Sequence, residues 1–223
     1  MSLPTFLKLP FIMPTFLRRL TVLLGLAAAL ASGHATADVA VQAGAQDAHL
    51  LVIKQQGIAG REIGAAVRVS YAGVADFVVE EARVALARRA AGEDVKAVFV
   101  VSREAGAYRV LVVRTALLAR DPALVEEVVA QFERARRWLV AHPQEGADLL
   151  ARAGFANLAA AQERLARGDF QVARPGPALA QSLKSAADPR QAAHIDALID
   201  DGPMRAATHA LTQSGRSALI SLR

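Results

Sequence analysis

The stretch 75–102, "ADFVVEEARVALARRAAGEDVKAVFVVS", contains two apolar runs with a helical segment between them. The first run belongs to "VADFVV" (74–79) and the second is "VKAVFVVS" (95–102); both are rich in valine and phenylalanine and predict strands. Residues 80–92 carry apolar side chains at helical spacing and end at a glycine, so they predict a helix. Because parallel strands need a crossover connection, usually a helix, this unit predicts an α/β fold.

Further strand-like runs lie on both sides of this unit. "DVAVQ" (38–42) and "AAVRVSY" (65–71) precede it, and "AYRVLVVR" (107–114) follows the turn "REAG". A buried helix is expected at 47–56, where four apolar residues are consecutive. Strands that alternate with helices predict a mainly parallel sheet covered by helices. We therefore expect one α/β lobe over 38–116.

The remainder, 117–223, is expected to be a helical region that packs on the lobe. Helix-opening signals are Asp121–Pro122, Pro143, Asn157, Pro177 and Pro189. The helix after Asp121 has an apolar stripe, formed by Leu124, Val125, Val128, Val129, Phe132, Ala135 and Leu139. Trp138 is a further core candidate. Glu133 and Arg137, four residues apart, are expected to pair on the solvated side.

The N-terminus is typical of a cleaved export signal. Arg18 and Arg19 precede an apolar run at 20–31, and "ATA" before Asp38 fits signal peptidase cleavage after Ala37. The alternative, a membrane anchor, would need about 20 apolar residues. Met13 is an alternative start that gives a signal of ordinary length. The interpretation is a signal peptide at 1–37 and a periplasmic protein.

Charge and cysteine content exclude several classes of protein. The net charge of +5 includes three basic residues of the signal, so residues 38–223 carry only +2. Basic side chains are scattered among acids and aromatic residues are few, which argues against nucleic-acid binding. The sequence has no cysteine, which excludes a lipoprotein anchor, a disulfide and a thiolate nucleophile.

The stretch 117–170 resembles the C-terminal helical part of substrate-binding proteins from nitrate-, sulfonate- and taurine-type ABC transporters. That family has a "P-E-L-V" helix that ends in "W-x-x-x-x-P-E-E-A", and a later "R-x-D-F"-like element. The matching residues are Pro122, Leu124, Val125, Trp138, Pro143, Glu145, Ala147, Asp169 and Phe170. "AHLLVIKQQG" (48–57) is similar to the family's first helix, and 75–102 is similar to its strand–helix–strand unit.

The chain departs from this family in three places, and the first is that the usual helix between "VRVSY" (67–71) and "ADFVV" (75–79) is missing. Family members have two α/β lobes, and a second lobe of roughly 100 residues would be expected between Ser102 and Thr115, where only "REAGAYRVLVVR" stands. Where the family has "G-E-A-P", the chain has Glu80, Glu81, Ala82 and Arg83. The resemblance therefore implies a periplasmic-binding-protein-like lobe that lacks most of its partner lobe.

Solutes of open α/β sheets bind beyond the carboxyl ends of the strands, where loops meet helix starts. The candidate ligand-binding residues are Gln46, Asp47, Ala48, Glu80, Glu81 and Ser102. Gln46 and the N–H groups of 47–49 could hold an anion. The alternative is that Asp47 caps the helix and satisfies those donors itself. Two acids at 80 and 81 would repel an anion and favour neutral or cationic solutes.

Catalytic and metal-binding patterns are missing from the sequence. The histidines lack metal-ligand spacing, and Glu126 and Glu127 face different ways around a helix. We expect no enzyme activity, no cofactor and no metal site. The resemblance implies a solute-binding component of an ABC importer for small organic anions, with a membrane permease as its partner. The alternative is a periplasmic interaction module that has lost its solute site and pairs with a second copy of itself, as a homodimer, or with another protein.

Overall fold

A computed structural model describes residues 39–43, 47–56, 67–70, 75–154 and 157–220. All of them belong to one compact unit, Thr36–Arg223. The predicted signal peptide and cleavage site, and the candidate residue Gln46, lie outside the described residues. Within the described part of the chain, no helix is long and apolar enough to cross a membrane.

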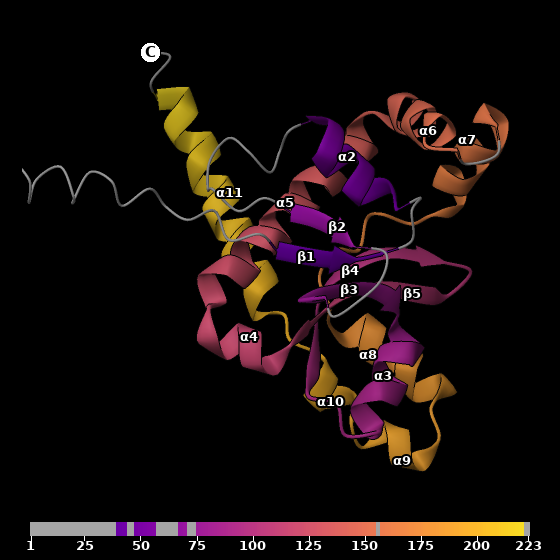
Figure 1. The fold of residues 1–223 in the computed structure, drawn as a ribbon, viewed down its shortest axis with the longest axis vertical. Coiled ribbons are helices and arrows are strands. Elements are labelled where there is room, and N and C mark those ends of the chain that lie inside the picture. Colours follow the sequence, from indigo (N-terminus) through magenta and orange to yellow (C-terminus); the bar gives the residue numbers. More distant parts are fainter. Residues whose placement is uncertain (1–38, 44–46, 57–66, 71–74, 155–156, 221–223) are drawn as a thin grey trace, which may run out of the picture. The chain divides into compact units, whose positions relative to one another are not determined.

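Five strands form one sheet with the order β2-β1-β3-β5-β4 (Figure 1). They are β1 (Val39–Gln42), β2 (Val67–Ser70), β3 (Phe77–Glu81), β4 (Val95–Glu104) and β5 (Ala107–Arg114). β1 pairs in parallel with β2 and β3, whereas β5 is antiparallel to both of its neighbours, β3 and β4. Four strands therefore point in one direction, and the expected mainly parallel lobe is confirmed.

A two-residue turn joins β4 to β5, at the place where a second lobe was expected. Ala105 and Gly106 both have positive φ angles, 49° and 85°, which is the pattern of a type I′ hairpin turn. This turn matches the right-handed twist of the two strands. The chain therefore returns at once into the sheet, and the fold is a single lobe.

Helices cover both faces of the sheet (Figure 1). On one face lie α2 (Ala48–Gln56), α5 (Pro122–Ala141) and α11 (Gly202–Ile220), with α6 (Pro143–Arg152) beside α2 and α7 (Leu158–Arg167) beside α6. On the other lie α3 (Ala82–Ala90), α8 (Pro177–Ala186) and α10 (Ile195–Leu198), with α9 (Pro189–Ala192) beside α3. The short α4 (Thr115–Arg120) leads from β5 to α5.

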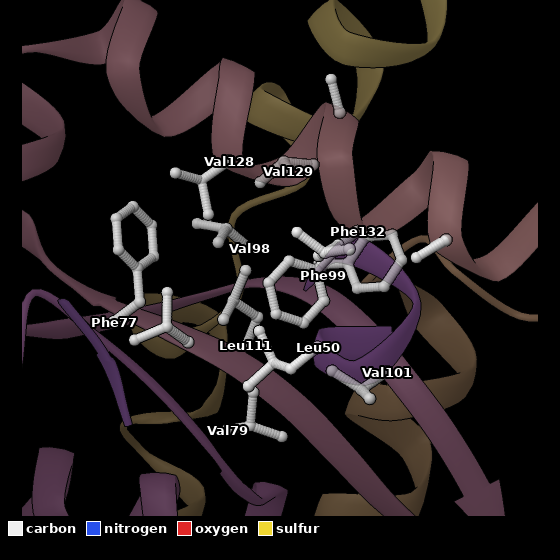
Figure 2. Close-up of a cluster of buried hydrophobic side chains, with 14 of the residues drawn as sticks. Leu50, Phe77, Val79, Val98, Phe99, Val101, Leu111, Val128, Val129 and Phe132 are labelled. Carbon is white, nitrogen blue, oxygen red and sulfur yellow. The ribbon is translucent and has the colours of Figure 1, made fainter. Parts of the chain in front are cut away.

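Strand alternation divides the core between these two faces. On β5, Leu111 and Val113 pack on the α5 side, and Val110 and Val112 on the α3 side. Figure 2 shows the larger, α5-side cluster. It includes Leu50, Phe77, Val79, Val98, Phe99, Val101, Leu111, Val128, Val129 and Phe132. The predicted apolar stripe of α5 therefore faces the sheet.

Most helix starts follow the predicted capping signals. Asp121 Oδ1 accepts a hydrogen bond from the Leu124 N–H at 3.0 Å, and Asn157 Oδ1 accepts one from the Ala160 N–H at 2.9 Å. His142 ends α5, and the proline after it starts α6. These local signals fix the helix boundaries, because a capping side chain accepts a hydrogen bond from the first turn and a proline already has a helical φ angle.

The predicted pair of Glu133 and Arg137 is confirmed, but Glu133 is buried and not solvated. Its side chain is only 2% exposed and pairs with Arg136 Nε at 2.6 Å and Arg137 Nε at 2.7 Å. Arg136 Nη1 also donates to the carbonyl oxygen of Phe170 at 2.8 Å. The segment after α7 therefore lies over this side of α5, a tertiary contact that helical periodicity does not encode.

The returning chain also covers the edge strand β4. Arg103 and Asp169 exchange backbone hydrogen bonds of 3.0 and 2.8 Å, and Val100 N–H donates to the Ala173 carbonyl at 2.8 Å. Farther along the strand, Asp200 N–H donates to the Ala97 carbonyl at 3.1 Å. Exposed strand edges invite pairing with other chains, so these contacts protect the sheet.

Candidate functional site

The carboxyl ends of β1 and β4 and the start of β5 meet at one edge of the sheet, because β5 alone runs backwards. Asp47 follows β1 and precedes α2, Ser102 lies near the end of β4, and Arg109 lies opposite Ser102 on β5. These three residues and Ala48 line a pocket of about 40 Å³, whose far side is formed by α7 and Phe170. Three of the predicted site residues therefore share one pocket.

Arg109 is a member of the site that sequence reasoning missed. Its backbone pairs with Glu81 on one side and Ser102 on the other. Its Nη1 atom lies 3.5 Å from Asp47 Oδ2, and its side chain is 29% exposed. Alternation along β5 gives Arg109 the same direction as Leu111, which is in the core. An arginine at a core-facing strand position could have been recognised in the sequence as a site candidate, because a buried positive charge needs an acidic partner.

Asp47 caps α2, as one of the two interpretations predicted. Its Oδ1 atom accepts hydrogen bonds from the N–H groups of His49 at 3.1 Å and Leu50 at 3.3 Å. These donors are therefore not available to a bound anion. Oδ2 differs: it accepts no hydrogen bond from any described residue, although the Asp47 side chain is 99% buried.

His49 lies beside Asp47 in an apolar setting. Its ring centroid is 5.7–6.1 Å from those of Phe99, Phe132 and Phe170. Burial is the main cause that lowers the pKa of His49 to about 4; Asp47 opposes this shift. The ring is therefore neutral at neutral pH. Nδ1 is 4.0 Å from Asp47 Oδ1, too far for a hydrogen bond, and Nε2 has no partner among the described residues.

The two glutamates of the predicted site do not join this pocket. Glu80 lies on the α3 side of β3 and pairs with Arg88 Nη1 at 2.7 Å. Burial raises the pKa of its carboxyl group, which Arg88 partly offsets. Glu81 lies beside the β4–β5 turn, where its exposed side chain is 3.8 Å from Arg83. Glu80 is held by an arginine of α3 and Glu81 is the residue before α3, so neither side chain lines the pocket at Asp47.

Two larger hollows lie elsewhere, one of about 340 Å³ near Glu80 and one of about 250 Å³ near Glu81. Glu80 and Glu81 are paired with the arginines just named, and Asp76 in the larger hollow accepts a hydrogen bond from the Ala40 N–H at 3.3 Å. In the described part of the chain, the buried side-chain atoms without a hydrogen-bond partner are Asp47 Oδ2, His49 Nε2 and Gln131 Oε1. Two of these three residues line the smaller pocket, so unmet hydrogen-bonding capacity singles it out as the candidate site.

Charged residues on the rim are mostly paired with one another. Arg103 Nη2 lies 2.8 Å from Asp169 Oδ2 and its guanidinium is 5.9 Å from the Tyr108 ring centroid. Glu104 lies 3.8 Å from Arg167. In the described ranges, no group of three or more acidic, histidine or cysteine side chains is arranged to hold a metal ion. The arrangement suits a small polar guest.

The sequence matches no protein-family model and no curated protein. The fold is similar to two solved structures. One is the ligand-binding component of an ABC-type import system from Staphylococcus aureus with zinc bound, with a TM-score of 0.61 and 8% identity over 77% of this chain and 98% of that one. The other is the Candida albicans CA3427 gene product, described as a new family with the generic periplasmic binding protein fold. Its TM-score is 0.60, with 9% identity over 74% of this chain and 96% of that one. The chain thus has a periplasmic-binding-protein-like fold.

Proposed function

We propose that the protein is a periplasmic solute-binding component of an ABC importer, with its solute site in the Asp47–Arg109 pocket. The observation that carries this proposal is the buried Asp47 Oδ2, which accepts no hydrogen bond from a described residue although Arg109 lies 3.5 Å away, in a pocket at the carboxyl edge of the sheet. Open α/β sheets bind ligands at this edge. The predicted export signal and the fold support the same role, and a membrane permease would be the partner.

The site is better suited to binding than to catalysis. His49 is packed among phenylalanines, and its Nδ1 atom lies 4.0 Å from Asp47 Oδ1, so the two residues do not form the hydrogen-bonded pair in which one group orients a catalytic base. We therefore infer that the protein is not an enzyme and needs no cofactor.

The solute class predicted from the resemblance is a small organic anion such as an alkanesulfonate, taurine or nitrate. Arg109 and Arg164 line the pocket and favour an anion, whereas Glu104 also lines it and opposes one. Asp47 opposes one, because its carboxylate lies in the same pocket and already occupies the helix donors. The anion assignment therefore rests on the resemblance.

A thermal-shift screen of small solutes tests the proposed function. A solute that binds only the folded protein with a millimolar Kd adds about 2.7 kcal/mol of stability at 100 mM. We expect a solute to raise the Tm of the wild type and of Arg120→Met, an exposed arginine outside the pocket, but not of Arg109→Met. If every solute acts equally on all three proteins, solute binding at this pocket is wrong.

The alternative, an interaction module, is favoured by one observation. The two-residue turn at Ala105 and Gly106 leaves the pocket edge without the second lobe that would enclose it. A face that a second lobe would have covered is a candidate for pairing with another protein. Gel filtration separates the two functions: a stable dimer that no solute stabilises supports the module, and a monomer stabilised by a solute supports transport.

A further inference from the structure

The pocket is lined by a carboxylate whose hydrogen-bonding capacity is only partly met by the described residues. Asp47 Oδ2 is buried and accepts no hydrogen bond within the described residues. A buried acceptor without a donor destabilises the folded protein. A guest that donates an N–H to this oxygen removes that destabilisation, so the site favours guests that carry a donor. An anion such as nitrate has none to offer.

The nearest cation balances this acceptor. Arg109 Nη1 lies 3.5 Å from Asp47 Oδ2, so the two charges that face each other sum to zero. A guest with a net negative charge gains from Arg109 and loses at Asp47, and a cation does the reverse. A neutral guest with one donor and one acceptor can use both side chains at once.

The size of the pocket limits the part of the solute that enters. Its volume is about 40 Å³, and roughly 10–15 Å³ of such space holds one water molecule. Three or four heavy atoms therefore fit. Ala48, Leu165 and Phe170 supply apolar wall, which suits a small planar group with polar atoms on one side.

From these contacts we propose that the pocket binds the uncharged carboxamide head group of a solute. The amide NH₂ donates to Asp47 Oδ2, and the amide oxygen accepts from Arg109. This inference rests on the proposed solute-binding function and replaces the anion class with an amide class.

Three probes of equal size and planar shape test the charge preference: acetate, acetamide and acetamidinium. They are titrated into the purified protein and followed by the amide signals of a proton–nitrogen NMR correlation spectrum. We expect acetamide to give saturable shifts with a Kd of roughly 1–30 mM, as a four-atom ligand allows. Acetate and acetamidinium should bind at least tenfold more weakly.

Asp47→Asn converts the acceptor into a donor without removing the cap, because asparagine caps helices about as well as aspartate. Its amide nitrogen would stand where Oδ2 stands, next to Arg109. We expect acetamide binding to weaken at least tenfold and acetate binding to strengthen. Asp121→Asn is the matched control: Asp121 caps α5 with the same chemistry outside the pocket, so it should change neither titration.

Three results would overturn the amide class. The first is tighter binding of acetate or acetamidinium than of acetamide by the wild type, which would leave solute binding itself intact. The second is acetamide binding that Asp47→Asn does not change. The third is the absence of binding by all three probes. In that case a larger solute with Arg109-dependent stabilisation would still uphold the transport function.

Discussion

At the scale of single residues, the two carboxylate oxygens of Asp47 have different partners. Oδ1 caps α2 and Oδ2 faces Arg109. From the sequence, helix capping and ligand binding were two alternative roles for Asp47. Sequence reasoning could identify Asp47 from the polar residue before an apolar helix, but it could not find its pairing with Arg109, because that pairing depends on the register between β5 and its neighbours.

His49 predicts a pH dependence of stability. Burial lowers its pKa from 6.5 to about 4 in the folded protein, so between these values the unfolded chain binds more protons than the folded one. Stability from this residue is therefore fully present above pH 6.5 and is lost as the pH falls towards 4. The loss is on the order of 3 kcal/mol.

Denaturant unfolding of His49→Phe against the wild type, from pH 7.5 to pH 4, measures this effect. Phenylalanine suits the surrounding aromatic cluster and cannot be protonated. We expect the stability of the variant relative to the wild type to rise as the pH falls below 6.5 and to be flat above it. His209→Gln, on the exposed side of α11, should follow the wild type. A difference for His49→Phe that does not change with pH would contradict the buried, neutral histidine.

At the scale of elements, the β4–β5 turn carries a local strain. Ala105 has a φ of 49°, a region that costs a non-glycine residue of order 1–3 kcal/mol. Asparagine tolerates this region better, and Asn-Gly is the preferred pair in a type I′ turn. We expect Ala105→Asn to stabilise the protein by about 0.5–1 kcal/mol, seen as a higher denaturant midpoint with an unchanged m-value.

Ala91→Gly provides the comparison for this change. Ala91 is exposed in the turn after α3 and has an ordinary φ of −78°. Glycine there only increases the freedom of the unfolded chain, so we expect no gain or a loss of up to about 1 kcal/mol. A lower midpoint for Ala105→Asn would show that the turn does not adopt the left-handed conformation.

Element boundaries were predictable wherever a local signal sets them. The Asp121 and Asn157 caps and the prolines at 143, 177 and 189 all open helices. Burial of Glu133 was not predictable, because the Phe170 carbonyl that helps to hold its partner Arg136 comes from 34 residues farther along the chain. The spacing of apolar and polar residues along the sequence does not report contacts between segments that are far apart in the chain.

At the scale of the whole molecule, the alternation of strands and helices was enough to predict one lobe. The run 102–115 was too short for a second lobe, and the structure places a two-residue turn there. The reversed direction of β5 follows from that short connection, because a two-residue hairpin can only join antiparallel strands. The sequence could not show which strands lie side by side, since that order depends on contacts between distant segments.

Export is a prediction for the whole chain, and it rests on the stretch from Arg18 to Ala37. N-terminal sequencing of the protein recovered from a Gram-negative host should begin at Asp38, because signal peptidase cleaves after the small-residue pattern "ATA". A recovered protein that still carries the apolar run 20–31 would contradict it.

We propose that the single lobe supplies one wall of a solute site. Two-lobed binders close over the solute and exclude water, which strengthens each polar contact. A site with a single wall remains exposed to water, and each exposed contact to a charge contributes roughly 0.3–1 kcal/mol to binding. After the cost of association, binding should be no tighter than about millimolar.

Calorimetry on the purified protein, with its monomeric state confirmed by light scattering, tests whether a single wall limits the affinity. The titrants are an alkanesulfonate, taurine, nitrate and acetamide. We expect no dissociation constant tighter than about 1 mM for any of them. A micromolar constant, measured on a confirmed monomer, would show that this lobe encloses its solute without a partner and would contradict the account.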